Sequence, residues 1–472
     1  MKIRHLLLYV LILIVLPLLS YSQSFQPEER TRIIVLTDIE NEPDDAQSLV
    51  RFLSYVNHFE FEGIIATTSI WLPNKTAEWR IYEILDAYKE VQPNLIIHEP
   101  GFPEYEELRS KVKKGLPVYG MQGVGEGKDS EGSDWIIQIL KNGDPRPLWV
   151  LAWGGPNCLA QALWKLQNTV SKEKLKEYIK KLRVYTISDQ DDSGPWMRKT
   201  FPDLFYICTP GYAHNGKEGY HFATWSGISG DTFHGRFQGA NREVIGASWI
   251  KENIQENHGP LGEQYPDVEY LMEGDTPSFL YLIANGLGSP ENPNYGSWGG
   301  RYELYTPPTQ KYYFEPETRP IWTNANDEVF SPIIDQYVTG NHATIWRWRE
   351  DFQNDFAARM DWCLKPYKEA NHPPIPALEH DEILEVNPGD EVKLIGSGTD
   401  PDGDELSFKW VYYREVGNSV YWLELENANS KVAGFKAPDL GYPQELHFIL
   451  SVTDKGNPAM IRYKRVIIKV ND

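Results

Sequence analysis

Two hydrophobic patterns divide the chain. Up to about residue 290, short runs of apolar and β-branched residues alternate with segments whose apolar residues recur at helical spacing. Runs of the first kind are typical of strands buried on both faces of a parallel sheet, and segments of the second kind are typical of the helices that cover it. The alternation therefore predicts an α/β fold with a mostly parallel sheet. The predicted strands are residues 33–36, 61–67, 95–97, 148–151, 183–187 and 205–208, and the clearest predicted helices are residues 46–55, 84–88 and 158–166.

From Ala377 onward the pattern changes to short alternating strands, at residues 392–395, 406–411, 446–452 and 463–470. Such strands separated by turn residues predict a β-sandwich. The proline-rich residues 371–376 predict a linker, because proline fits neither a helix interior nor a central strand. We therefore expect a main domain at 30–290, an extension at 291–370 that packs on it through an amphipathic helix at 346–364, and a sandwich domain at 371–472.

Residues 1–22 have the pattern of a secretory signal peptide. Lys2 and Arg4 precede an apolar run over residues 6–19, and Ser20 and Ser22 follow it. This order predicts cleavage and export, which would make the protein secreted or periplasmic, with no stable membrane span. An uncleaved anchor helix is the alternative, although the apolar run is shorter than a usual span.

Composition narrows the class of partner. The net charge of −21 and the pI near 5 argue against binding to nucleic acid or to anionic membranes. The chain carries 16 tryptophans and 27 tyrosines, and flat rings with a polar tip suit the faces of sugars as well as a core. Its three cysteines are too few for a disulfide framework, so one bridge and buried free thiols both stay open: Cys158, Cys208 and Cys363.

Three aspartates gather between the first predicted strand and the first predicted helix. Asp38 follows the strand, and Asp44 and Asp45 follow Pro43, which is well placed at a helix start. Converging carboxylates repel one another unless a cation lies among them, and an all-oxygen ligand set favours calcium. The alternative is an acidic loop in which one aspartate caps the helix.

Residues 37–45, Thr-Asp-Ile-Glu-Asn-Glu-Pro-Asp-Asp, resemble the start of the inosine–uridine nucleoside hydrolases, whose signature is Asp-Thr-Asp-x-x-x-Asp-Asp. Asp38 matches the second aspartate and Asp44-Asp45 the closing pair, whereas Leu36 replaces the first aspartate and the loop is two residues longer. This form looks like the secreted branch described as cellulose-binding, with a nucleoside-hydrolase-like domain and a C-terminal immunoglobulin-like domain. The resemblance implies a Rossmann-type sheet and a calcium site.

The resemblance also implies the remaining ligands. In the family a backbone carbonyl before a glycine completes the metal site, and Trp153 holds that position here. The late calcium carboxylate matches Asp275, although Gly274 replaces the family's histidine. The implied calcium ligands are Asp38, Asp45, Asp275 and the carbonyl of Trp153. A close-packed strand–helix turn at Gly154 and a helix cap at Asp275 are the simpler readings of the same residues.

Further positions are candidates for contacts with a substrate. The loop after the strand at 183–187 lacks the asparagines and glutamate with which the family holds a sugar, and offers carboxylates and an indole instead. This departure indicates a substrate other than an ordinary ribonucleoside, although a solvated acidic loop is equally consistent. The candidate substrate-binding residues are Asp44, Trp71, Asn157, Asp191, Asp192 and Trp196.

The function predicted on these grounds is calcium-dependent hydrolysis of a glycosyl bond in a carbohydrate or glycoside. Asp38 is the expected general base. The alternative is a non-catalytic protein that binds cellulose or another polysaccharide through the same pocket and the immunoglobulin-like domain. The sequence does not identify the acid that protonates the leaving group, and His214, His221 and His234 are unranked candidates for it. It does not determine the oligomeric state either.

Overall fold

The computed structural model describes residues 30–210, 222–233, 239–307, 316–419 and 422–471. The predicted signal peptide at 1–22 lies outside the described residues, and so do His214, His221 and His234. The fold reported below is that of the unit Thr31–Asp472. No helix in the described part of the chain combines the length and the apolar character needed to cross a membrane.

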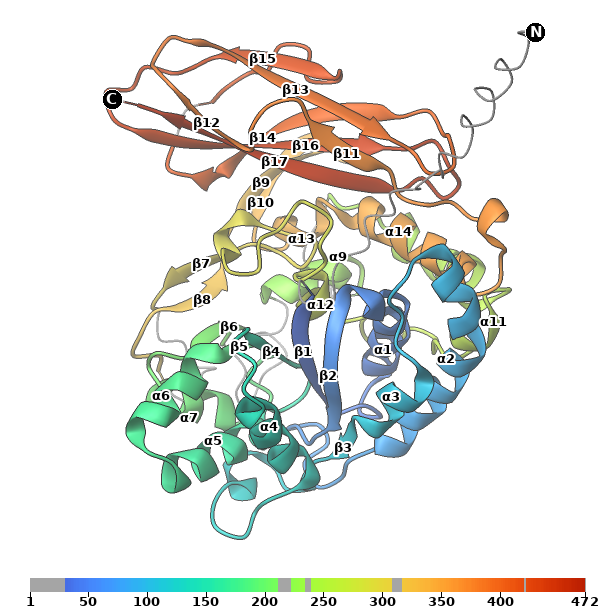
Figure 1. The fold of residues 1–472 in the computed structure, drawn as a ribbon, viewed down its shortest axis with the longest axis vertical. Helices are drawn as coiled ribbons and strands as arrows, with labels where there is room; N and C mark the ends of the chain where they lie inside the picture. Colours follow the sequence, from blue (N-terminus) through green and yellow to red (C-terminus); the bar gives the residue numbers. More distant parts are fainter. Residues whose placement is uncertain (1–29, 211–221, 234–238, 308–315, 420–421, 472) are drawn as a thin grey trace, which may run out of the picture. The chain divides into compact units, whose positions relative to one another are not determined.

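An eight-stranded sheet forms the first part of the fold, in the order β3-β2-β1-β4-β5-β6-β8-β7 (Figure 1). Neighbouring strands pair in parallel except for β7, which is antiparallel to β8 at the edge. The chain leaves β1 toward β2 on one side and returns to β4 on the other, so the strand order reverses between β1 and β4. The strands are β1 Thr31–Thr37, β2 Phe59–Ala66, β3 Val112–Lys114, β4 Leu148–Ala152, β5 Leu182–Ser188, β6 Phe205–Thr209, β7 Tyr302–Tyr305 and β8 Ile321–Asn324.

Helices cover both faces of this sheet. Alternate residues of β1 enter two different cores, with Ile33 and Val35 on one face and Ile34 and Leu36 on the other. All four side chains are fully buried, as expected for a parallel strand between two helical layers. The described α-helices are α1 Pro43–Tyr55, α2 Glu78–His98, α3 Tyr105–Ser110, α4 Glu131–Lys141, α5 Asn157–Thr169, α6 Lys172–Lys181, α7 Ser193–Thr200, α9 Gly230–Phe233, α10 Ala247–Ile250, α11 Gly259–Glu263, α12 Pro277–Leu280, α13 Ala343–Trp346 and α14 Arg349–Asp361.

The predicted strand at 95–97 is wrong, because these residues form the last turn of α2. Leu95 is buried while Ile96 and Ile97 are exposed, which is helical rather than strand spacing. The helix continues through Pro93 to His98. The third strand is β3, farther along the chain.

The chain after residue 290 extends the main sheet. β8 lies beside β6 and β7 beside β8, so residues 302–324 supply its last two strands. A separate antiparallel hairpin follows, formed by β9 Asp327–Ser331 and β10 Gln336–Gly340. The predicted helix at 346–364 is α13 and α14, and α14 buries residues around its whole circumference instead of one stripe.

Two further sheets form the C-terminal part, with the orders β11-β13-β15 and β12-β17-β16-β14. Their inner faces share one hydrophobic core, which includes Leu394, Trp410 and Phe448. The predicted fold class, a mostly parallel α/β sheet followed by a β-sandwich, is therefore confirmed. The strands are β11 Ile375–Leu378, β12 Ile383–Val386, β13 Glu391–Thr399, β14 Ser407–Gly417, β15 Val432–Lys436, β16 Gln444–Thr453 and β17 Ile461–Val470.

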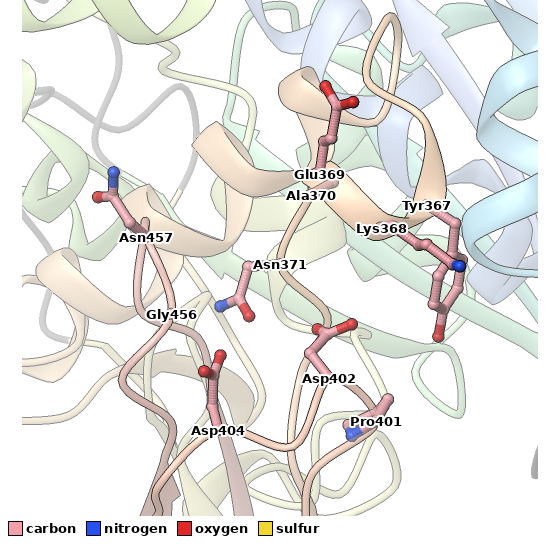
Figure 2. A pocket seen from close by; sticks show the side chains of 10 residues that line it. All are labelled: Tyr367, Lys368, Glu369, Ala370, Asn371, Pro401, Asp402, Asp404, Gly456 and Asn457. Atoms are coloured by element: carbon pink, nitrogen blue, oxygen red, sulfur yellow. The ribbon is translucent and has the colours of Figure 1, made fainter.

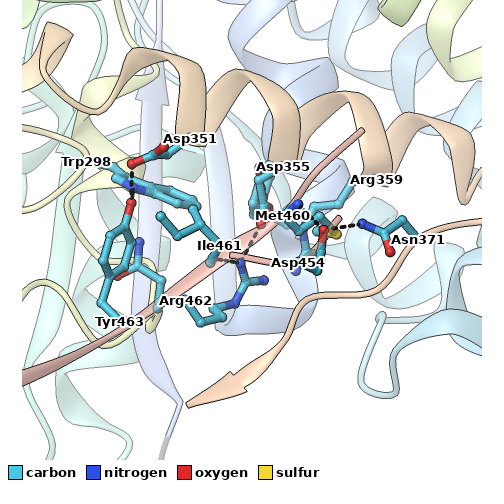
Figure 3. A network of polar contacts seen from close by, with 12 residues as sticks. Trp298, Asp351, Asp355, Arg359, Asn371, Asp454, Met460, Ile461, Arg462 and Tyr463 are labelled. Atoms are coloured by element: carbon cyan, nitrogen blue, oxygen red, sulfur yellow. Dashed lines mark hydrogen bonds and ion pairs between the residues drawn. The ribbon is translucent and has the colours of Figure 1, made fainter. Parts of the chain in front are cut away.

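The start of β17 reaches α14, as Figure 3 shows. Arg462 Nη1 donates to Asp355 Oδ2 at 2.5 Å, and the Tyr463 hydroxyl donates to Asp351 Oδ2 at 2.5 Å. The indole of Trp298 donates to the same hydroxyl at 3.1 Å. Hydrogen bonds and packing thus join the sandwich to the helical layer.

The three cysteines are free and buried, so no disulfide contributes to the fold.

Candidate functional site

The acidic residues lie at the carboxyl end of β1, beside the point where the strand order reverses. Ligands of open α/β sheets bind at this kind of position. Asp38 follows the last residue of β1, and the chain then turns through Glu40, whose φ is +74°, before Pro43 begins α1. Asp44 and Asp45 therefore stand in the first turn of α1, where the helix dipole favours negative charge.

A carboxylate from far along the chain joins them. Oxygens of Asp44, Asp45 and Asp275 all lie within 4.8 Å of one another, and the three side chains are buried. Asp275 stands just before α12, 230 residues after Asp45 in the sequence. Asp38 is not in this closest group, but its charge acts on all three of them. We call Asp38, Asp44, Asp45 and Asp275 the acidic cluster.

Burial and mutual repulsion make ionisation of the acidic cluster costly. Burial, with a smaller effect from Glu42, raises the pKa of Asp38 to about 6. Burial, then Glu42 and Asp38, raise the pKa of Asp44 to about 8. The pKa values of Asp45 and Asp275 lie well above their usual range for the same reasons.

The described residues provide no lysine or arginine that forms an ion pair with the acidic cluster. Two of its oxygens, Asp38 Oδ2 and Asp275 Oδ2, are buried without a hydrogen-bond partner. Thr37 Oγ1 donates to Asp45 Oδ1, and Ser69 bonds to Asp38. Carboxylate oxygens that converge, have free lone pairs and have no cationic partner suit a hard divalent cation as ligands, so the cluster could hold such an ion.

Two glycines let the end of β4 approach these carboxylates. A Cβ on Gly154 would lie 2.6 Å from Asp38 Oδ1, and one on Gly155 would lie 2.2 Å from Asp191 Oδ2. Any larger residue at either position would displace an acid.

The carbonyl of Trp153, a predicted ligand, already accepts a hydrogen bond from Gln190 Nε2. Its indole donates to Ser278 Oγ at 2.8 Å, and Ser278 in turn donates to the carbonyl of Asp275 at 2.7 Å. These contacts tie the end of β4 to the segment that carries Asp275. One lone pair of the Trp153 carbonyl remains for a second partner.

Two predicted substrate-binding residues also present unpaired acceptors near this edge. Asp191 Oδ1 accepts from the backbone N–H of Ser193 at 2.8 Å and from its hydroxyl at 2.5 Å, while the buried Oδ2 has no partner. Burial raises the pKa of Asp191 to about 7. Asn157 Nδ2 donates to the carbonyl of Val118 at 2.8 Å, and the buried Oδ1 has no partner.

The other three candidates have different surroundings. Asp192 accepts from the backbone N–H of Met121 at 2.8 Å, which anchors the glycine-rich loop before α4. Trp196 packs edge-on against Phe201, 5.7 Å between ring centroids, in the second core. Trp71 is 41% exposed and follows Ser69, the partner of Asp38.

Comparison with known proteins places the chain in a family. Residues 32–302 match the family model described as cellulose-binding Sde182, nucleoside hydrolase-like domain. The chain belongs to this cellulose-binding, nucleoside-hydrolase-like family. Residues 391–470 match a second model, the C-terminal domain of cellulose-binding protein Sde0182. The resemblance stated from residues 37–45 is thereby confirmed.

A solved structure of the same kind covers nearly the whole chain. It is a nucleoside hydrolase-related protein from Saccharophagus degradans that is associated with carbohydrate metabolism, 35% identical over 94% of this chain and 100% of that one, with a TM-score of 0.78. A PKD domain from the KIAA 1837 protein is 27% identical over 20% of this chain and 87% of that one, with a TM-score of 0.16. The effector XopQ, solved with adenosine diphosphate ribose, is 10% identical over 62% of this chain and 87% of that one, with a TM-score of 0.29. No curated protein sequence matches the chain.

Within the family fold, three residues take positions that the sequence did not single out. The Gln190 side-chain amide donates to the Trp153 carbonyl, and Ser69 forms a hydrogen bond with Asp38. The negative charge of Glu42 raises the pKa of every member of the acidic cluster. Glu42 lies inside the acidic loop, so its charge is visible in the sequence. No local pattern marks Gln190 or Ser69, because each contact joins separate segments.

A cavity of about 510 Å³ lies elsewhere, where the predicted linker meets the sandwich (Figure 2). Asn371, Asp402 and Asp404 line it, and no member of the acidic cluster does. Asp400 Oδ1 accepts from the backbone N–H groups of Asp402 and Asp404, at 2.9 and 3.0 Å, which is a local turn. The cavity and the acidic cluster are thus separate features of the family fold.

Proposed function

We propose that the protein is an exported, calcium-dependent hydrolase that cleaves a glycosyl bond in a carbohydrate or glycoside. The observation that carries the proposal is the acidic cluster: four buried carboxylates at the strand-order reversal, with two orphaned oxygens and no cationic partner among the described residues. Membership of a cellulose-binding, nucleoside-hydrolase-like family supports both the reaction class and the ligand class.

Asp44, Asp45 and Asp275 would hold the cation, with Asp38 beside them and the Trp153 carbonyl as a further donor. A bound calcium ion supplies positive charge that lowers the pKa of a coordinated water and attracts hydroxyl groups of a substrate. Because Asp44 is one of the three carboxylates closest to one another, we assign it a role as a ligand of the cation in addition to its contact with a sugar hydroxyl.

Asp38 is the proposed general base. Its Oδ2 has no hydrogen-bond partner, and Ser69 holds the carboxyl in place. Asp38 would take a proton from water while the water oxygen bonds to the anomeric carbon. The bond from that carbon to the leaving group breaks, and the electron pair leaves with the group. With a pKa of about 6, Asp38 is ionised at neutral pH and able to accept the proton.

The free acceptors Asp191 Oδ2 and Asn157 Oδ1 indicate what the substrate supplies. Buried acceptors without partners are costly, and hydroxyl groups are the donors that a sugar offers in quantity. We assign these two side chains to the orientation of substrate hydroxyls near Asp38.

The second candidate is a protein that binds polysaccharide at this site without cleaving it. Gly274 stands where the resemblance implies a histidine near the leaving group, and the family is named for cellulose binding. On this reading the acidic cluster holds calcium and sugar, and no bond breaks.

The test measures turnover and calcium binding on the same material. Wild-type protein and Asp38→Asn are incubated with nitrophenyl glycosides, cello-oligosaccharides and nucleosides, with calcium or with a chelator. We expect calcium-dependent release of sugar or aglycone, lowered about 10²–10⁴-fold by Asp38→Asn, and a rise in Tm with calcium in the wild type. Asp351→Asn is the matched control, since this half-buried acid accepts a hydrogen bond from Tyr463 outside the acidic cluster.

Turnover that is unaffected by chelation or by Asp38→Asn would overturn the mechanism. Absence of turnover on all three substrate classes, together with calcium-dependent sugar binding, would establish the non-catalytic alternative instead.

A further inference from the structure

The β9–β10 hairpin has two unlike faces. Phe330 and Tyr337 are directly opposite in the antiparallel ladder, so their side chains share one face, with ring centroids 5.3 Å apart. They are 45% and 54% exposed. Their neighbours Val329 and Val338 pack on the opposite face against a small buried cluster that includes Trp346. The inner face thus holds the hairpin to the protein and the outer face carries two open rings.

A third exposed ring continues this surface from the sandwich. Trp422, in the segment between β14 and β15, is 52% exposed and lies edge-on to Tyr337, 5.9 Å between centroids. The guanidinium of Arg414 lies 4.4 Å from the Trp422 ring centroid. We call Phe330, Tyr337 and Trp422 the aromatic platform.

Buried polar contacts brace the aromatic platform from below. Asp327, at the start of β9, is fully buried and accepts from Arg301 at 2.7 Å, from Arg347 at 2.9 Å and from the Tyr413 hydroxyl at 2.7 Å. The backbone N–H of Glu328 donates to Glu415 Oε1 at 2.8 Å. Because Tyr413 and Glu415 belong to β14, these bonds join the hairpin to the sandwich strand and hold the rings in place before any partner arrives.

The charges around the rings are paired. Arg414 forms an ion pair with Glu328, and Arg347 pairs with Asp327 and lies 3.9 Å from Glu415. The cation in contact with the exposed rings, Arg414, is thus neutralised within the chain, which suits a neutral partner. The faces of a pyranose present C–H groups, which pack on the electron-rich face of an aromatic ring.

From these contacts we propose that the aromatic platform is a docking surface for a neutral β-linked glucan chain. The inference takes carbohydrate as the ligand class from the proposed function, but it does not depend on bond cleavage or on calcium. The planes of neighbouring rings are inclined at 65° and 80°, so one ring would stack on a sugar face while the others contact the edges of adjacent sugar units, at a place separate from the acidic cluster.

The experiment measures retention of the full chain on microcrystalline cellulose. The variants are Tyr337→Ala, Trp422→Ala and the double variant, with Trp422→Phe to keep a ring. Trp79→Ala is the matched control, since Trp79 is 48% exposed on α2. Retention is measured with calcium and with chelator, which separates this proposal from the one at the acidic cluster. The Tm and its rise with calcium are recorded for every variant, which shows whether each folds.

We expect about tenfold weaker retention for each alanine variant, a larger loss for the double variant and a smaller one for Trp422→Phe. Trp79→Ala should be retained like the wild type, and retention of every protein should be the same with calcium and with chelator. Full retention of the double variant, or an equal loss with Trp79→Ala, would overturn the assignment. So would a wild-type dimer that Trp422→Ala dissociates while retention stays unchanged, because a second copy would then be the occupant.

Discussion

Asp45 and Asp355 are both buried aspartates, yet their pKa values move in opposite directions. Asp45 stands among Asp38, Asp44 and Glu42, and burial together with these charges raises its pKa. Burial would also raise the pKa of Asp355, but the charges of Arg462 and Arg359 outweigh it and lower the pKa. We call the contact between α14 and the start of β17 the junction (Figure 3). The junction carries its own cations, whereas the acidic cluster does not.

The two regions differ in whether their carboxylates are satisfied within the chain. At the junction Asp355 accepts from Tyr55 at 2.8 Å, from Arg359 at 3.2 Å and from Arg462 at 2.5 Å, so its oxygens are satisfied within the chain. In the acidic cluster two oxygens have no partner. A fold that leaves buried carboxylates uncompensated gains stability when a ligand brings the missing charge. The same substitution, aspartate to asparagine, should therefore have opposite effects in the two regions.

The largest effect is expected at the junction. Asp355→Asn leaves the half-buried Arg462 without its carboxylate and the buried Arg359 with Glu99 alone, and should lower the free energy of unfolding by about 3–5 kcal/mol. Denaturant unfolding measures this loss. Asp86→Asn, at an exposed acid, is the control and should change stability by less than about 0.5 kcal/mol. A loss at Asp355 as small as the control's would show that the arginines find other partners.

The second effect is a loss of stability on acidification, and it also comes from the junction. Burial, and then the charge of Arg359, lower the pKa of His58 to about 4, whereas an unfolded histidine titrates at 6.5. Between these values only the unfolded chain binds the proton, so stability falls as the pH drops from about 6.5 to 4, by up to about 3 kcal/mol. His58→Gln keeps an acceptor for Arg359, and the difference between its unfolding curve and the wild-type curve isolates this group. Parallel pH profiles of the two proteins would contradict the assignment.

The smallest effect has the opposite sign. Asp45→Asn removes one of the mutually repelling charges and keeps an oxygen for the Thr37 hydroxyl. Without calcium, we expect the variant to be as stable as the wild type or more stable by about 1 kcal/mol. With calcium, its Tm should rise much less than that of the wild type. Calorimetric scans with calcium and with chelator measure both quantities, and a destabilised chelated variant would show that the acidic cluster is compensated by the protein after all.

The parts of this comparison that the sequence predicts are the local ones. The apolar run before Asp38 and the helical spacing after Pro43 placed the first strand and helix, and with them three of the four acids. Asp275 required the resemblance, because no local pattern links it to residues 37–45. The three carboxylates closest to one another are those of Asp44, Asp45 and Asp275, with Asp38 beside them. This arrangement depends on the turn after β1, in which Glu40 has a positive φ. The residue types alone do not determine the conformation of that turn.

Contacts between distant segments escaped prediction for the same reason. Residues 371–376 were predicted as a linker from their prolines, and the sequence did not indicate that Asn371 and His372 are buried and hydrogen-bonded to Asp454 and Asp402. Whether a given tyrosine or tryptophan is buried or exposed also depends on the final packing. Tyr463 is buried against Trp298, whereas Tyr337 is open.

The insertion of Arg462 and Tyr463 against α14 sets an order of events during biosynthesis. The backbone N–H of Tyr463 also donates to the carbonyl of Asn285 at 2.9 Å, so a strand made late completes layers made much earlier. Until residue 463 has left the ribosome, Asp351 and Asp355 lack these contacts and the helical layer stays unfinished.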